Sequence, residues 1–210
     1  MLPETLKEKF HGGRIKISRA VSNVVGGFKS DRLRVVLMAG FLFSAGFTFF
    51  TTFFGVYLRN NFNFSSAKIG DYFAIVGLFI AISQAVVVAK VAKKLADWKV
   101  LRFSMFGLGA MMLVYFVIPT TSSYFLYLVV PFFTLFNGLT MANMSSLISR
   151  SAEMGQQGQA MGIYSSVSSL TQVPASILVG YITSDITSSQ PLFVSSACII
   201  LGGAVFFILF

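Results

Sequence analysis

The chain has 210 residues, of which 55% are hydrophobic and only 11% are charged, and its mean hydropathy is +0.78. Soluble domains carry about 25% charged residues, so this composition excludes an ordinary soluble domain and predicts an all-α membrane protein. The net charge of +9 does not indicate nucleic-acid binding, because the basic residues stand between apolar runs. A single cysteine, Cys198, excludes an intramolecular disulfide, and a single histidine, His11, argues against a catalytic or metal cluster. We therefore predict no enzyme, no metal site, no cofactor and no nucleic-acid partner.

Five uncharged stretches define the membrane spans, since a helix needs about 20 apolar residues to cross the hydrocarbon. They are Val35–Leu58, Tyr72–Ala89, Phe103–Ser149, Met154–Ser184 and Ile186–Phe210. The third stretch has 47 residues and contains Pro119-Thr-Thr-Ser-Ser123, which favours a turn. We therefore predict six transmembrane helices within residues 35–210, at about 35–58, 70–89, 102–118, 124–149, 157–184 and 190–210.

The basic residues predict the orientation, because short cytoplasmic loops retain Lys and Arg. With the N-terminus inside, 14 of the 16 basic residues lie inside and only Arg59 and Lys68 lie outside. Both termini are then cytoplasmic. Six tyrosines fall near outer helix ends, where their rings suit the headgroup level: Tyr57, Tyr72, Tyr115, Tyr124, Tyr127 and Tyr181. Trp98 would anchor the inner surface.

Residues 1–34 form a basic cytoplasmic segment in which eight Lys and Arg residues mix with apolar ones, interrupted by Gly12-Gly13 and Gly26-Gly27. This pattern suits a short helix on an anionic membrane surface. A solvated loop with little structure fits equally well. No compact apolar core with a cleavage site follows the charged N-terminus, so we do not expect a secretory signal peptide.

Polar side chains are unevenly divided among the spans. The third span has only Ser104, and the sixth has Ser195, Ser196 and Cys198, small groups that can bond to their own helix. We predict that these two spans face lipid. The other four carry many hydroxyls and amides and should surround something polar, because such groups are costly in hydrocarbon.

Helical spacing selects the residues that would line this cavity. Thr48, Thr51, Thr52 and Gly55 share one face of the first span, and Ser165, Ser168, Ser169 and Gln172 share one face of the fifth. A single hydroxyl can equally serve helix packing, but an amide must satisfy four hydrogen-bonding positions. The predicted substrate cavity consists of Phe49, Thr52, Phe53, Gln84, Asn137, Ser168 and Gln172.

The chain resembles the C-terminal six-helix half of a major facilitator superfamily transporter, in particular the drug:proton antiporter branch. The motifs that carry the resemblance are Leu2-Pro-Glu-Thr5, Phe28-Lys-Ser-Asp-Arg-Leu-Arg34 and Gln157-Gly-Gln-Ala-Met-Gly162 with Ser166, Ser169, Leu170, Pro174 and Gly180. The resemblance implies a half-bundle of two inverted three-helix repeats. Gly70 to Gln84 and Gly158 to Gln172 have the same spacing, and a hydroxyl residue precedes each glutamine.

The loop at Ala89–Lys99 occupies the place of the family's cytoplasmic gating loop, with lysine in place of its acid and alanines in place of its glycines. Lys90, Lys93, Lys94 and Asp97 remain as a predicted cytoplasmic gate that would contact another bundle. No charged residue lies deep in a span, and Asp71 at an outer helix end suits a capping or interfacial role.

These observations predict small-molecule transport in the cell (inner) membrane, as efflux of amphipathic or drug-like compounds by alternating access. The expected partners are a small-molecule substrate, the lipid bilayer, and an N-terminal six-helix bundle or second chain. The alternative is a six-helix membrane fragment or assembly partner without transport activity of its own.

Overall fold

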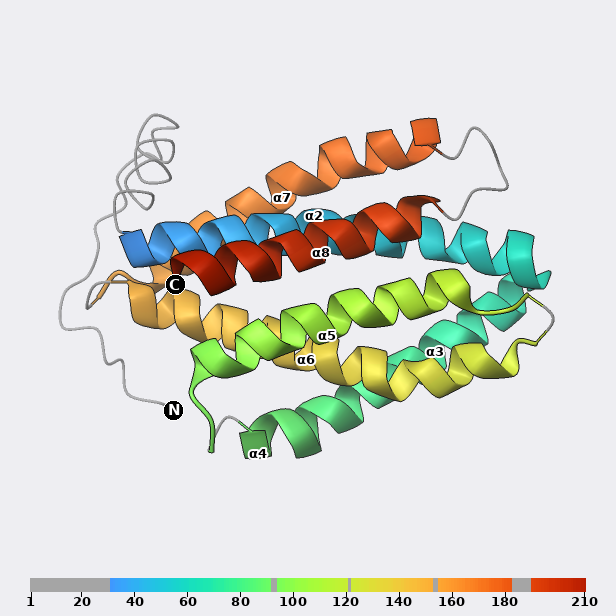
Figure 1. The fold of residues 1–210 in the computed structure, drawn as a ribbon, viewed down its shortest axis with the longest axis horizontal. Helices are drawn as coiled ribbons and strands as arrows, with labels where there is room; N and C mark the ends of the chain where they lie inside the picture. Colours follow the sequence, from blue (N-terminus) through green and yellow to red (C-terminus); the bar gives the residue numbers. More distant parts are fainter. Residues whose placement is uncertain (1–30, 92–93, 121, 153–154, 183–189) are drawn as a thin grey trace, which may run out of the picture.

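The computed structural model describes residues 31–91, 94–120, 122–152, 155–182 and 190–210. The predicted basic segment 1–34 therefore lies almost entirely outside the described residues. Within them, the chain forms six long rods that run side by side (Figure 1). In chain order these are α2 (Asp31–Phe62), the continuous run of α3 (Ser66–Ile82), η1 (Ser83–Val88) and α4 (Ala89–Val91), α5 (Asp97–Val117), α6 (Tyr124–Ser151), α7 (Gln157–Ile182) and α8 (Gln190–Leu209).

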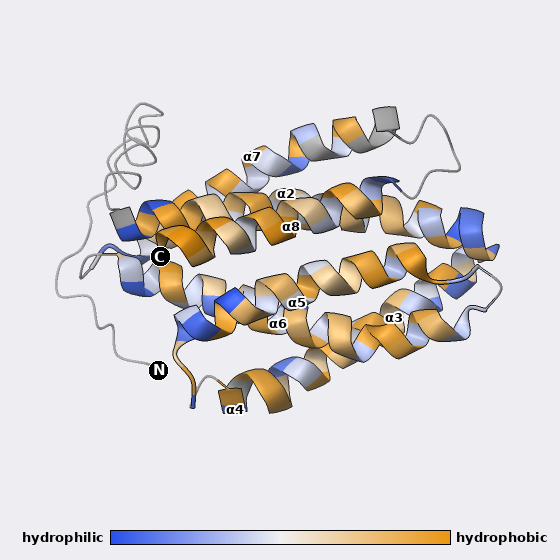
Figure 2. Ribbon diagram, in the orientation of Figure 1, coloured by the Kyte–Doolittle hydropathy of each residue, from blue (hydrophilic) through white to orange (hydrophobic). Residues whose placement is uncertain are grey.

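Five of the rods are long and apolar enough to cross a membrane: α2, α3 with η1, α5, α6 and α8. The remaining rod, α7, has 26 residues, which is also long enough to span. Residues such as Ser165, Ser169 and Gln172 lower its apolar content, and Figure 2 shows it paler than α8. The predicted fold class, an all-α membrane protein with a six-helix bundle, is confirmed.

The turn predicted inside the longest apolar stretch separates α5 from α6. Ile118 ends α5 with an extended backbone, φ −60° and ψ 125°, as expected for a residue that precedes proline. The Ser122 amide then donates to the Pro119 carbonyl at 3.4 Å. This turn divides the 47-residue stretch into two helices.

The six rods pack as two equivalent three-helix repeats. The first repeat runs from α2 to α5 and the second from α6 to α8. The last helix of each repeat packs along the first helix of the other: α5 packs along α6, and α8 packs along α2. The middle helix of each repeat also packs along the first helix of the other repeat. Thus α7 packs along α2, and α3 with η1 packs along α6. This exchange is the arrangement expected of inverted repeats, and α5 and α8 pack against each other on one side of the bundle.

Small residues allow the closest approaches between these helices. A Cβ atom built on Gly46 of α2 would lie 2.7 Å from the Ser195 carbonyl oxygen of α8. One built on Gly109 of α5 would lie 2.5 Å from Ile200 of α8. Membrane helices use small residues in this way to bring their backbones together.

The two spans predicted to face lipid are each packed on one side and exposed on the other. Phe103 of α5 is 69% exposed and Phe207 of α8 is 55% exposed, whereas Ser104 and Ser196 are fully buried. Ser104 donates to its own helix at the Leu101 carbonyl. The prediction that small polar groups of α8 bond to their own helix is wrong for Ser196, which donates to the Gly109 carbonyl of α5 at 2.8 Å.

Three of the tyrosines predicted at the headgroup level are buried inside the bundle. Tyr57, Tyr72 and Tyr115 are at most 2% exposed. The Tyr57 hydroxyl donates to the Tyr115 carbonyl at 2.6 Å, and the hydroxyls of Tyr72 and Tyr115 lie 2.9 Å apart. Because each of these hydroxyls has a hydrogen-bond partner inside the bundle, the rings need no water. Tyr124, by contrast, is 85% exposed, and Tyr181 lies outside the described side chains.

Candidate substrate cavity and inner charge cluster

The two glutamines predicted to line the cavity occupy matching environments. Gln84 and Gln172 are exposed, whereas the hydroxyl residues that precede them, Ser83 and Thr171, are 6% and 4% exposed. Thr171 donates to the Ser168 carbonyl at 2.6 Å. In both repeats the hydroxyl therefore faces the bundle and the amide faces away from it, on the helix that flanks the core.

The helix carrying Gln84 changes geometry at this position. Residues Ser83–Val88 form a π-helix, η1, which is wider than an α-helix and marks functional sites in many proteins. A Cβ atom built on Gly138 of α6 would lie 3.4 Å from Ser83 Oγ, so η1 and α6 approach closely here. Sequence reasoning missed this element, because no proline or glycine interrupts Ser83–Val88.

Two buried polar atoms near this approach have no hydrogen-bond partner in the described structure: Ser83 Oγ and Asn137 Oδ1. Asn137 is only 2% exposed. Buried polar atoms without partners are rare in native proteins and call for a specific explanation. Ser83 and Gly138, the neighbour of Asn137 in the sequence, thus meet where η1 packs on α6.

The cavity residues predicted on α2 divide between core and surface. Phe49 and Phe53 are 6% and 3% exposed and belong to the hydrophobic core, whereas Thr52 is exposed. The neighbouring Thr48 donates to the Ser44 carbonyl, and Thr51 donates to the Phe47 carbonyl. These two hydroxyls therefore bond to their own helix. A ligand contact of Phe49, Thr52 or Phe53 remains a prediction.

Ser168 of α7 forms a polar contact with α2. Its hydroxyl lies 2.9 Å from the hydroxyl of Ser44 on α2, and Ser44 is 9% exposed. Sequence reasoning missed Ser44, although it stands one helical turn before Thr48 on the same face as the predicted stripe. The predicted cavity residues thus form one group at α6 and η1 and another at α2 and α7.

The predicted cytoplasmic gate is only partly described. Lys90 and Lys94 are exposed, and Lys93 lies outside the described residues. Asp97 is 8% exposed and turns into its own bundle, where it accepts from the Ser146 hydroxyl at 2.6 Å and lies 3.3 Å from Arg150 Nε. These contacts connect the inner ends of α5 and α6.

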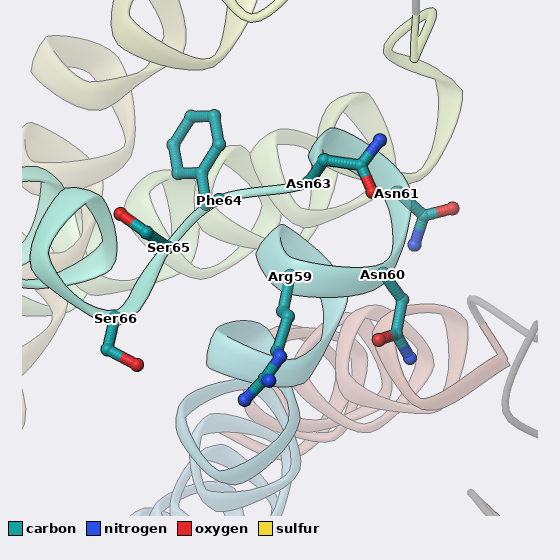
Figure 3. Close-up of a pocket in the computed structure, with 7 residues that line it drawn as sticks. All are labelled: Arg59, Asn60, Asn61, Asn63, Phe64, Ser65 and Ser66. Carbon is teal, nitrogen blue, oxygen red and sulfur yellow. The ribbon is translucent and has the colours of Figure 1, made fainter.

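A pocket of about 810 Å³ lies at the opposite end of the bundle, around the turn between α2 and α3 (Figure 3). Phe64 fills the base of this turn at 2% exposure, and Lys68 lies 4.3 Å above its ring. Asn63 has a positive φ of 53°, which Asn tolerates better than most residues. None of the predicted cavity residues lines this pocket. Its full lining is Arg59, Asn60, Asn61, Asn63, Phe64, Ser65 and Ser66.

The family assignment comes from a sequence match to a family model. The model for the Major Facilitator Superfamily matches residues 3–176, which is most of the chain. The chain belongs to the major facilitator superfamily. It is therefore a multi-pass membrane protein of a family of membrane transporters.

Two mammalian proteins resemble part of the chain. Hippocampus abundant transcript-like protein 1 of Rattus norvegicus is 28% identical over 138 residues, and that of Mus musculus is 30% identical over the same length. Each match covers 61% of this chain and 25% of the relative. The chain thus matches about a quarter of the length of these proteins.

Proposed function

We propose that the chain forms the C-terminal half of a small-molecule transporter and works with an N-terminal six-helix bundle or a second chain. The observation that carries this proposal is the matching exposure of Gln84 and Gln172 in the two repeats. An amide in hydrocarbon leaves hydrogen-bonding positions unsatisfied. The exposed sides of η1 and α7 therefore need water, substrate or another bundle rather than lipid alone.

The substrate class follows from what surrounds the glutamines. Gln84 stands between Ile82 and Val86, which are 48% and 46% exposed, and Gln172 stands between Leu170 and Val173, which are 69% and 64% exposed. Large apolar side chains beside single amides suit an amphipathic compound with few polar groups. We therefore propose efflux of amphipathic or drug-like compounds, as in the drug:proton antiporter branch.

The mechanism proposed is alternating access, in which the two bundles rock about a site near the middle of the membrane. The close packing of α5 with α6 and α8, and of α8 with α2, would let this half move as one body. At the inner surface, Lys90, Lys93 and Lys94 would contact the second bundle, and the ion pair of Asp97 with Arg150 would hold α5 to α6. The basic residues favour cytoplasmic termini in the cell (inner) membrane.

The test is an efflux assay in cells that co-express the chain with any six-span polypeptide that is encoded upstream. Release of a fluorescent lipophilic cation is compared for the wild type, Gln84→Ala and Gln172→Ala. Leu201→Ala is the matched control, because Leu201 is 56% exposed on α8, away from the proposed cavity. We expect slower efflux in both glutamine variants at unchanged protein level, and unchanged efflux in the control.

Equal efflux by all four proteins would overturn the cavity assignment. If the wild-type pair exports no probe, the alternative is favoured, namely a six-helix assembly partner without transport activity.

A further inference from the structure

A groove of about 460 Å³ opens on the outer side of α5 and α8, at the basic end of the bundle. It is separate from the proposed substrate cavity, because neither α3 nor α7 contributes to it. Aromatic side chains make up most of its lining, and two basic side chains, Lys99 and Arg102, complete it. The residues that line it are Trp98, Lys99, Arg102, Phe103, Phe106 and Phe207.

Arg102 is held at the head of this groove. Its Nη2 donates to the Phe207 carbonyl at 3.3 Å, and its guanidinium carbon lies 4.3 Å from the Phe207 ring and 5.2 Å from the Trp98 ring. Its Nε is buried without a hydrogen-bond partner in the described structure. A buried N–H of a charged group gains the most from an anionic acceptor.

Asp97 does not neutralise the positive charge of the groove. Asp97 directly precedes Trp98, but it turns toward α6 and engages Ser146 and Arg150. Lys99 adds a second positive charge and lies 5.2 Å from the Trp98 ring.

Trp98 also lines a second groove of about 440 Å³, which carries further basic residues from α2. Arg32 and Arg34 stand at this groove together with Val35, Leu209 and Phe210. Trp98 is 37% exposed and lines both grooves. Tryptophan at a helix end, with basic side chains beside it, is typical of the headgroup level of a membrane.

We propose that the groove of α5 and α8 binds an anionic phospholipid. The lipid phosphate accepts from Arg102 and Lys99, and an acyl chain lies along Phe103, Phe106 and Phe207. Phe103 and Phe207 are more than half exposed, so the apolar part of the ligand continues directly into the surrounding hydrocarbon. A soluble phosphate would use only the basic edge and leave this aromatic surface uncovered.

Trp98 provides the readout, because it is the single tryptophan of the chain. The purified chain is reconstituted in vesicles of phosphatidylcholine mixed with phosphatidylglycerol, with bromine near the top of the acyl chains of one lipid or the other. Bromine quenches tryptophan fluorescence on contact, so the two series give the relative affinity for the anionic lipid at Trp98. We expect a preference for phosphatidylglycerol that falls about fivefold when one basic side chain is removed.

The variants are Arg102→Gln and Lys99→Gln, with Arg59→Gln at the opposite end of the bundle as the matched control. Lys99 is exposed, so its variant tests the proposal even if Arg102→Gln alters packing. Loss of preference in both variants and its retention in the control would support the site. No preference in the wild type, or an unchanged preference in both groove variants, would overturn it, as would displacement of the lipid by inorganic phosphate.

Discussion

The contact between α2 and α8 at Gly46 predicts a large difference between two glycine substitutions on the same helix. A Cβ at Gly46 would lie 2.7 Å from the Ser195 carbonyl oxygen, 2.8 Å from Ile199 and 3.1 Å from the Cys198 Cβ. A backbone oxygen cannot rotate away, so Gly46→Ala must push the two helices apart. A Cβ at Gly55, in the same helix, meets nothing within 4 Å.

The magnitude follows from two opposing effects. Replacing a helical glycine by alanine gains about 1 kcal/mol from helix propensity, and both variants receive this gain. Overpacking costs about 1–3 kcal/mol and applies only to Gly46→Ala. The two variants should therefore differ by about 2 kcal/mol in free energy of unfolding. For a chain of this size, that corresponds to about 4–8 °C in the midpoint of thermal unfolding.

The assay uses Cys198, which is the single cysteine of the chain and is half-buried beside Gly46. A maleimide that becomes fluorescent on reaction follows exposure of this thiol during heating in detergent. Gly46→Ala should react faster at low temperature and show the lower midpoint, whereas Gly55→Ala should match or exceed the wild type. Equal midpoints for the two variants would refute the close approach of α2 and α8.

Three further predictions concern the inner cluster, the tyrosine cluster and the buried amide. Asp97→Ala should lower the free energy of unfolding by about 1–3 kcal/mol, whereas Arg150→Gln should cost about 0–1 kcal/mol because Arg150 is 74% exposed; equal thermal midpoints would contradict this difference. Tyr115→Phe should cost about 1–3 kcal/mol by removing the hydroxyl partner of Tyr72, and the exposed Tyr124→Phe serves as its control in the same melting assay. Asn137→Leu should raise the thermal midpoint, since it removes the unpartnered Oδ1, and should slow efflux. A lower thermal midpoint together with slower efflux would indicate a structural role.

Much of the fold follows from the sequence because the bilayer imposes simple rules on length and charge. The prediction that Pro119 and the hydroxyl residues after it form a turn in the longest apolar stretch is confirmed by the turn at Ile118 and Ser122. The equal spacing of Gly70 to Gln84 and Gly158 to Gln172 indicated two repeats, and the matching burial of Ser83 and Thr171 agrees with it.

Side-chain partners were not predictable in the same way. Tyr57, Tyr72 and Tyr115 stand at the helix ends where aromatic rings usually meet headgroups, but their hydroxyls pair across helices that are distant in sequence. Ser196 could have bonded to its own helix, and only the approach of α8 to Gly109 decides otherwise. The π-helix Ser83–Val88 packs against α6, and no local signal in the sequence marks it.

In the proposed transporter, the exposed sides of η1 and α7 that carry Gln84 and Gln172 meet water, whereas the outer side of α5 and α8 meets lipid. Reactivity of introduced cysteines tests it most directly, because a thiol ionises and reacts in water but stays protonated in hydrocarbon. In a Cys198→Ala background, Gln84→Cys, Gln172→Cys, Phe103→Cys and Leu201→Cys are treated with a charged thiol reagent in membranes that contain both bundles. We predict fast labelling at positions 84 and 172 and slow labelling at positions 103 and 201. Equal labelling at all four positions, or faster labelling on α5 and α8, would contradict the account.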